Sequence, residues 1–162
     1  MPKNPLSVMA QWPFSYRLLL QSAALVELAE KVLRRLTRDR FGVLDLVGTP
    51  SVQLLIPGRR SGIVRPTTLQ TIEADDGFLV VGSNWARPSH PAWSANLQAI
   101  KTVRVRHRDK EFQASVREMV GAERAQAWDS ILRAWPNYAI AQGMASERPF
   151  RIFALAPDAG GS

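Results

Sequence analysis

Apolar residues recur along this chain with two different periods. Between residues 14 and 38 they return every three or four positions, which predicts a helix. In the middle of the chain the apolar runs are short or alternate with polar residues, which is typical of strands. The strands predicted in this way are SVQLLIP, IVRPTTLQTIEA, FLVVGS, TVRVRHR, EFQASVREMV and RPFRIFALAP, and the further helices are AWSANLQAI and GAERAQAWDSILRAW.

Tight turns separate several of these strands. GRRSG, ADDG and RDK each lie between two consecutive strands and predict hairpins. Hairpin-linked strands form an antiparallel sheet, and a sheet can remove its exposed edges by closing into a barrel. Pro66 lacks a backbone N–H, so the beginning of its strand is expected at a sheet edge or a bulge. The pattern therefore predicts an α+β fold, an antiparallel barrel with an N-terminal helix and flanking helices.

Length and composition fit one globular domain over residues 1–162, with an N-terminal helical segment at 1–45 and a body at 50–157. A domain of about 150 residues buries roughly 70% of the surface of its unfolded chain, enough for a core and a pocket. The chain has no cysteine, which excludes disulfides and thiolate metal sites. With two histidines, a histidine-rich metal centre is excluded as well, and no metal is expected.

The N-terminal helix has an apolar stripe and a cluster of arginines near its end, at positions 34, 35, 38 and 40. One interpretation is a helix packed on the body of the domain. The other is a basic amphipathic helix that rests on a membrane or lines a lipophilic substrate site. Glutamates interrupt the apolar stretch, so it resembles neither a signal peptide nor a spanning helix, and a cytoplasmic protein is expected.

The net charge of +7 favours anionic partners. Part of the excess is concentrated in GRRSGIVR, where three arginines, two glycines and a serine follow the first strand. Guanidinium groups are forked donors suited to phosphate or carboxylate, and glycine allows a ligand to approach the backbone. The segment is a candidate anion-binding turn, and the alternative is a solvated basic turn. Its candidate residues are Arg59, Arg60, Ser61, Gly62 and Arg65.

Two further segments could contribute to a site. In VGSNWARPSHPAW, small polar residues end a buried strand, where a ligand often meets the backbone; His90 is more simply explained as a helix cap. In WPNYAIAQ, Trp135 and Tyr138 follow the break at Pro136. They are either ordinary core residues or the walls of a flat pocket, with the Tyr138 hydroxyl able to donate a hydrogen bond or a proton.

Other chemistries find no support in the sequence. It contains no G-x-S-x-G elbow, no H-E-x-x-H motif and no cysteine nucleophile. The basic face of TVRVRHR has no interleaved aromatic residues that could stack on bases, so nucleic-acid binding is not expected.

Taken together, three blocks resemble the deazaflavin-dependent nitroreductase family of actinobacteria, whose members use reduced coenzyme F-420. GRRSGIVR is similar to the family's G-R-K/R-S-G-x-x-R signature, and GSNWARPSHPAWSANL to its S-N/K-G-G followed by P-x-W-x-x-N-L. ERAQAWDSILRAWPNYAIAQ resembles its E-R-x-x-x-W ending in Y-P-x-Y. The resemblance covers residues 50–157 and implies a split β-barrel.

The resemblance also implies roles for individual residues. Arg60, Ser61 and Arg65, with Arg59 and Gly62, would bind the phosphate and polyglutamate tail of the cofactor. The deazaflavin ring would lie against a set comprising Ser83, Asn84, Trp85, Ala86, Pro91 and Trp93. The substrate side would be lined by Trp135, Tyr138 and Gln70, with Tyr138 and Ser83 as the catalytic pair. A quinone, an enone or a nitroaromatic compound would accept the hydride.

The sequence departs from the family pattern near the ring. Trp85 and Ala86 replace the two glycines of the loop, and Ala141 replaces the last of the substrate-side tyrosines. The bulk of Trp85 keeps an FMN-binding oxidoreductase of the same fold open as an alternative. A non-catalytic protein that binds a cofactor or a lipophilic ligand is the second alternative. Either a monomer or a homodimer is compatible with the sequence.

Overall fold

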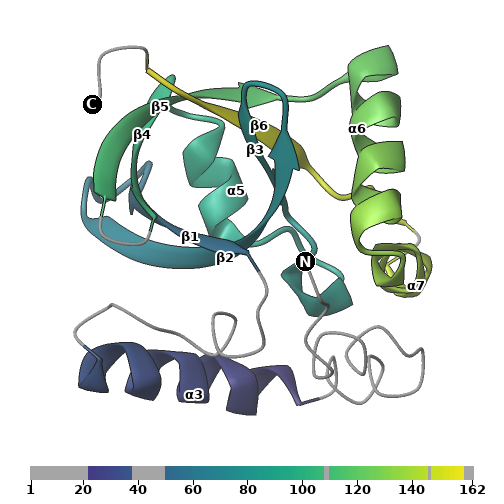
Figure 1. The fold of residues 1–162 in the computed structure, drawn as a ribbon. Coiled ribbons are helices and arrows are strands. Elements are labelled where there is room, and N and C mark those ends of the chain that lie inside the picture. Colours follow the sequence, from purple (N-terminus) through teal and green to yellow (C-terminus); the bar gives the residue numbers. More distant parts are fainter. Residues whose placement is uncertain (1–21, 38–49, 108–109, 146, 159–162) are drawn as a thin grey trace, which may run out of the picture.

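A computed structural model describes residues 22–37, 50–107, 110–145 and 147–158 (Figure 1). The helices and strands follow one another along the chain in the order α3 (Ala23–Leu36), β1 (Ser51–Pro57), β2 (Val64–Ala74), β3 (Gly77–Val81), the 3-10 helix η1 (Asn84–Ala86), α5 (Ala92–Leu97), β4 (Thr102–His107), β5 (Lys110–Glu118), α6 (Gly121–Ala134), α7 (Asn137–Met144) and β6 (Ile152–Pro157).

The strands in the described part of the chain form a closed antiparallel barrel with the order β1-β2-β3-β6-β5-β4. Three hairpins join β1 to β2, β2 to β3 and β4 to β5, at the turns that the sequence predicts. The barrel closes where β1 pairs with β4, with Leu54 opposite Val105. The predicted α+β barrel is thus confirmed.

Pro66 occupies the edge position that its missing N–H predicts. It lies opposite Leu55 of β1, while β3 pairs with β2 only from Thr71 to Ala74. Residues 64–70 of β2 therefore have a paired strand on one side only. The proline interrupts no hydrogen-bond ladder between β2 and β3.

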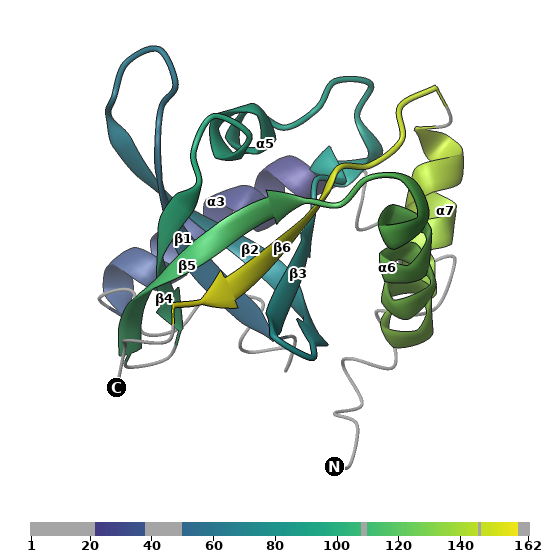
Figure 2. The same cartoon turned by 90° about the horizontal axis from the view of Figure 1, so that it is seen from above.

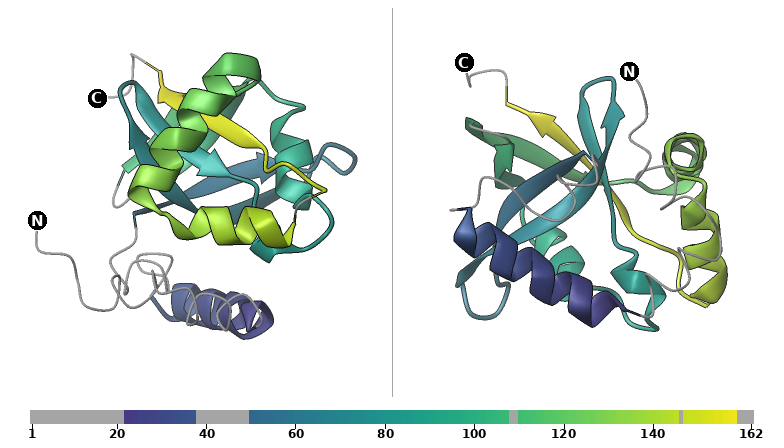
Figure 3. Two further views of the ribbon diagram at one scale, coloured as in Figure 1. Left: turned by 90° about the vertical axis from the view of Figure 1, so that its right-hand side faces the viewer. Right: turned by 60° about the horizontal axis from the view of Figure 1, so that its bottom comes forward.

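Alternating side chains fill the interior of the barrel. On β4, Val103 and Val105 are buried while Arg104 and Arg106 face outward, as the sequence pattern predicts. α5 packs against one end of this interior, where Leu97 is fully buried. A second apolar cluster lies between the barrel wall and the flank covered by α6 and α7 (Figure 3).

The sequence predicts that the helix ends at the break before Pro136 and does not predict α7. The proline instead precedes the first turn of a new helix, a position where its missing N–H costs nothing. The last strand begins at Ile152 rather than at Arg148, because the segment before it, which contains Pro149, makes no ladder.

α3 lies beside β1 and β2 with little contact to the barrel (Figures 1 and 3). Of its six large apolar side chains, Val26 and Leu33 are half-buried. The other four, Leu25, Leu28, Val32 and Leu36, are 50% to 77% exposed. An ion pair of 3.3 Å joins Glu27 to Arg87. Most of the apolar stripe that was expected to pack on the body is therefore exposed in the single chain. The rest of the predicted helix, residues 14–21 and 38, and the outer arginines at 38 and 40 lie outside the described residues.

Candidate functional site

The basic turn between β1 and β2 is shaped by its glycines. The Gly58 N–H donates to the carbonyl of Ile63 (2.9 Å), and the Gly62 N–H donates to the carbonyl of Gly58 (2.7 Å). Gly62 has a φ of +66°, which glycine adopts without strain, and no atom lies within 4 Å of the place where a Cβ would stand. The turn is therefore open to a ligand on this side.

The arginines of this turn have no acidic partner among the described residues. Arg59, Arg60 and Arg65 are exposed and make no ion pair there. Other arginines of the barrel and helices are paired, for example Arg106 with Glu111 and Arg117 with Glu123. The turn and the start of β2 thus concentrate three guanidinium groups without an acidic partner, an arrangement that attracts a multivalent anion.

α5 connects this turn to the loop that follows β3. The backbone N–H of Arg59 donates to Oδ1 of Asn96 on α5 (3.2 Å). At the other end of α5, the buried Pro91 packs beside Gly82. Trp93 is half-buried and its ring packs on Phe153, 6.0 Å between centroids, so only part of it is available to a ligand. Figure 2 shows the hairpin tip, α5 and η1 along one side of the barrel.

The loop after β3 has an unusual backbone. Asn84, Trp85 and Ala86 have φ values of 49°, 54° and 57°, so three successive residues other than glycine are left-handed. Such a conformation costs a non-glycine residue about 1–2 kcal/mol. Trp85 and Ala86 stand where the pattern of the resembling family has two glycines. Strain of this kind persists only where the surroundings enforce it.

Replacing Ala86 with glycine should reveal this strain. Glycine adopts a positive φ freely, whereas in an ordinary helix an alanine-to-glycine change is destabilising by about 0.5–1 kcal/mol. We expect Ala86→Gly to be more stable than the control Ala125→Gly, an exposed change within α6, by about 1–2 kcal/mol. Urea unfolding of both variants measures the difference. Equal destabilisation of the two would contradict a strained loop.

The residues expected on the substrate side come together beside this loop. The Tyr138 hydroxyl donates to Oε1 of Gln70 at 3.4 Å, joining α7 to β2. Tyr138 is 7% exposed and belongs to the apolar cluster against which Trp85, Ala86 and Trp135 pack. Nε2 of Gln70 is buried and has no hydrogen-bond partner among the described residues. An unpaired buried donor is costly, and a ligand carbonyl could satisfy it.

Arg148 is a residue of this region that the sequence analysis missed. It is 7% exposed, and its guanidinium donates to the carbonyls of Gly82, Ser83 and Arg87. It belongs to no motif and precedes a proline in a segment interpreted as strand. No local signal could have identified it, because its partners are more than 60 positions away in the chain.

A cavity of about 460 Å³ adjoins Arg148, between the loop before α5 and the end of α7. His90 lines it, and its Nδ1 lies 3.4 Å from Nη1 of Arg148. Partial burial lowers the pKa of His90 below its usual 6.5, and the positive charges of Arg151 and Arg148 lower the pKa further. The ring is therefore neutral at pH 7 and can accept a hydrogen bond from Arg148.

The lowered pKa of His90 predicts a pH-dependent stability. Below pH 6.5 the unfolded chain binds a proton at this histidine more readily than the folded one, so the free energy of unfolding falls as the pH drops. Melting temperatures at pH about 7.5 and about 5.5 measure this. His90→Gln keeps an acceptor for Arg148 without titrating, and its melting temperature should fall less. An equal fall would assign the pH dependence to other groups.

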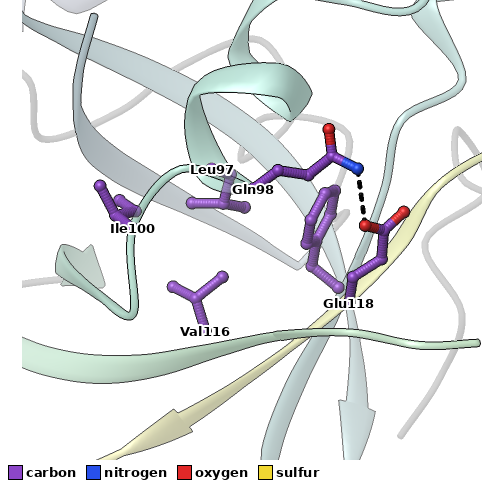
Figure 4. A pocket seen from close by; sticks show the side chains of 6 residues that line it. Leu97, Gln98, Ile100, Val116 and Glu118 are labelled. Carbon is purple, nitrogen blue, oxygen red and sulfur yellow. Dashed lines mark hydrogen bonds between the residues drawn. The ribbon is translucent and has the colours of Figure 1, made fainter. Parts of the chain in front are cut away.

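A second cavity, of about 230 Å³, lies under α5 (Figure 4). A hydrogen bond of 2.7 Å from Gln98 to Glu118 joins two of its lining residues. None of the residues singled out in the sequence lines it; the lining consists of Leu97, Gln98, Ile100, Val116, Glu118 and Phe153. The candidate site is therefore the path from the basic turn past α5 to the left-handed loop, not this cavity.

The described residues contain no cluster of three or more histidine and acidic side chains placed to hold a metal ion. Within the same part of the chain, no helix has the length and apolar character needed to cross a bilayer.

Comparison with known proteins identifies relatives with this architecture. Residues 30–157 match the model of the family described as F-420H(2)-dependent quinone reductase. A solved structure titled as an F-420-H2 dependent reductase, FDR-A, is 32% identical, with a TM-score of 0.59, over 65% of this chain and 93% of its own. A structure described as a domain-swapped dimer is 31% identical, with a TM-score of 0.61, over 83% of this chain and 98% of its own.

A more distant structure shares the fold alone. The heme storage protein HutZ from Vibrio cholerae is 14% identical, with a TM-score of 0.51, over 82% of this chain and 92% of its own. None of these comparisons supports the FMN alternative. Because the family match spans most of the chain, and the reductase structure has the same kind of barrel, the protein is an oxidoreductase that belongs to the F-420H2-dependent quinone reductase family.

Proposed function

We propose that this protein binds coenzyme F-420 along the path from the basic turn to the left-handed loop and reduces a small conjugated acceptor: a quinone, an enone or a nitroaromatic compound. When bound, the reduced cofactor supplies a hydride from its C5 carbon. The observation that carries the proposal is the group of three uncompensated arginines on an open turn, tied by Asn96 to the helix that leads to the loop. The phosphate and polyglutamate tail is a multivalent anion that suits this turn.

Within this proposal, the turn and the loop bind different parts of the cofactor. Arg60 and Arg65, with Arg59, Ser61 and Gly62, bind the tail. The ring lies against the loop, for which the candidate residues are Ser83, Asn84, Trp85, Ala86, Pro91 and Trp93. The strain of the loop supports this assignment, because strained backbone is concentrated at ligand sites.

On the substrate side, Tyr138 and Ser83 hold the catalytic roles, and Trp135 and Gln70 line the acceptor site. The acceptor gains negative charge on an oxygen as it is reduced, and a hydrogen-bond donor at that oxygen stabilises the transition state. The Tyr138 hydroxyl can supply a proton there, and the unpaired Nε2 of Gln70 can donate a hydrogen bond. The apolar cluster beneath both side chains excludes water.

A titration tests the cofactor. Purified protein is mixed with F-420 or FMN and the ligand fluorescence is followed; we expect saturable binding of F-420 and none of FMN. The reduced cofactor is then mixed anaerobically with a quinone and an enone. Binding without turnover of any acceptor would favour the non-catalytic alternative. Binding of FMN alone would overturn the cofactor assignment.

We also infer that two copies of the chain pair through α3. The apolar stripe of this helix is exposed in the single chain, and a relative of 31% identity is described as a domain-swapped dimer. Exposed stripes of this kind normally meet a partner surface. A second copy supplies that surface without another protein.

Light scattering tests the pairing. We expect twice the 18.0 kDa mass of one chain, and a monomer after the double change Leu28→Glu and Val32→Glu. Lys31→Ser, on the polar side of the same helix, should leave the mass unchanged. A monomeric unmodified protein would overturn the pairing, and its binding to anionic vesicles would support a membrane contact instead.

A further inference from the structure

We propose that Arg148 is a positioning residue, which holds the backbone of residues 82–87 in the conformation that receives the deazaflavin ring. The identity of the ligand rests on the proposed function. The role of Arg148 in holding the loop rests on the geometry alone. The guanidinium of Arg148 donates to backbone carbonyls of this segment, so it acts through the backbone that it orders.

The hydrogen bonds of Arg148 span the strained segment. Nη1 donates to the carbonyl of Gly82 at 3.0 Å, and Nη2 donates to that of Ser83 at 2.8 Å. On the far side of the left-handed residues, the Arg87 carbonyl accepts from both Nη2 (2.9 Å) and Nε (3.2 Å). One planar group therefore sets the separation between the residues that enter the loop and the residue that leaves it.

The hydrogen bonds of Arg148 add to the few bonds that the left-handed loop makes itself. The backbone bonds of the loop are few. The N–H groups of Ala86 and Arg87 donate to the carbonyls of Ser83 and Asn84, both at 3.0 Å. At the entry to the loop, the N–H groups of Gly82 and Ser83 donate to the carbonyls of Arg151 (2.8 Å) and Val81 (3.0 Å). Nδ2 of Asn84 adds one contact to the carbonyl of Ser89 (2.8 Å). Three non-glycine residues at positive φ are held only when the surroundings over-determine them. The guanidinium of Arg148 supplies these additional constraints, because it donates to carbonyls on both sides of the left-handed residues.

The surroundings of Arg148 point to positioning rather than ion pairing. No carboxylate pairs with it among the described residues. Its partners are three backbone carbonyls and Nδ1 of His90, and its guanidinium lies 4.9 Å from the centre of the Phe150 ring. Burial, reinforced by the charge of Arg151, lowers the pKa of Arg148. A buried charge without a counter-ion is costly, and a simple packing role would not require it. Lysine could not replace it fully, because its ammonium lacks the planar fork.

The first test measures the loop without any ligand. Amide hydrogen exchange of the unmodified protein is compared with that of Arg148→Met and Arg124→Met. Arg124 is the matched control, because it also donates to a backbone carbonyl, that of Phe150 (3.1 Å), but does not touch the loop. We expect exchange at Ala86 and Arg87 to become at least about tenfold faster in Arg148→Met alone. Unchanged exchange in a folded Arg148→Met would overturn the proposal.

The second test distinguishes binding of the deazaflavin ring from binding of the cofactor tail. Each variant is titrated with complete F-420 and with the deazaflavin riboside that lacks the phosphate and tail. Arg148→Met should weaken both ligands by the same factor, about tenfold or more, whereas Arg60→Ala with Arg65→Ala should weaken only the complete cofactor. A role in stability alone would lower the melting temperature of Arg148→Met without changing the affinity of the folded protein, and that result would overturn the proposal.

Arg148→Lys keeps the test decisive if Arg148→Met does not fold. Lysine retains the charge but not the planar fork, so the affinity of Arg148→Lys for the deazaflavin riboside should be reduced but not abolished. An affinity equal to that of the unmodified protein would overturn the proposal. Absence of F-420 binding by the unmodified protein would instead overturn the proposed function and the ligand part of this inference. The exchange measurement would still decide whether Arg148 holds the loop.

Discussion

Replacing Arg60 and Arg65 together with alanine should weaken the binding of complete F-420 by about a hundredfold. Each guanidinium loses a charge-assisted contact to the anionic tail, and an exposed contact of this kind contributes about 1.4 kcal/mol, or a factor of ten. Neither arginine has an acidic partner in the described chain, so its removal leaves no carboxylate unpaired. Fluorescence titration at moderate salt measures the change.

The control for this prediction removes the same charge elsewhere. The pair Arg117→Ala and Arg133→Ala lies on β5 and α6, and it also lowers the net charge by two. If the arginines of the turn act locally, this control should change the affinity by less than about twofold. Equal losses in the two double variants would show that general attraction, rather than the turn, binds the tail.

Changing Tyr138 to phenylalanine should lower kcat by about a hundredfold while KM for the acceptor changes little. A positioned acid contributes about two to four orders of magnitude to a rate, and the change removes only the hydroxyl. The ring should stay in place, because it packs edge-on to Trp128 at 6.5 Å within the apolar cluster. Stopped-flow oxidation of the reduced cofactor by a quinone measures the rate.

Trp135→Phe is the comparison for this variant. Trp135 is proposed to line the acceptor site without exchanging a proton, so its change should raise KM more than it lowers kcat. A melting temperature for Tyr138→Phe near that of the unmodified protein confirms that the lost bond to Gln70 has not unfolded α7. If kcat were unchanged, or if kcat and KM worsened alike, Tyr138 would have no role in proton transfer.

The barrel could be predicted in some detail because its signals are local. Alternation on β4 assigned Val103 and Val105 to the interior, and the turns GRRSG and ADDG located two hairpins. Pro66 was assigned to an edge by the chemistry of one residue. α7 was missed, because a proline is compatible both with the end of one helix and with the start of the next.

The candidate site was predictable only in part. The arginines of the turn and the loop after β3 stand out as short motifs, and Gln70 and Tyr138, predicted for the same side of the site, are in contact. Asparagine tolerates a left-handed backbone, but tryptophan and alanine rarely adopt it, so the conformation of Trp85 and Ala86 could not be predicted from their identities. The exposure of the α3 stripe likewise depends on what the rest of the chain leaves uncovered.

By itself, the sequence determined the strand pattern, the hairpins and the basic turn, because periodicity and turn chemistry act over a few neighbouring residues. Only the tertiary structure decided that Arg148 reaches the loop at residues 82–87 and that an unpaired amide of Gln70 lies beside Tyr138. Hydrogen bonds between residues more than 60 positions apart exist only after the barrel has closed and α7 has packed against it. No local sequence pattern predicts hydrogen bonds between residues that are so far apart in the chain.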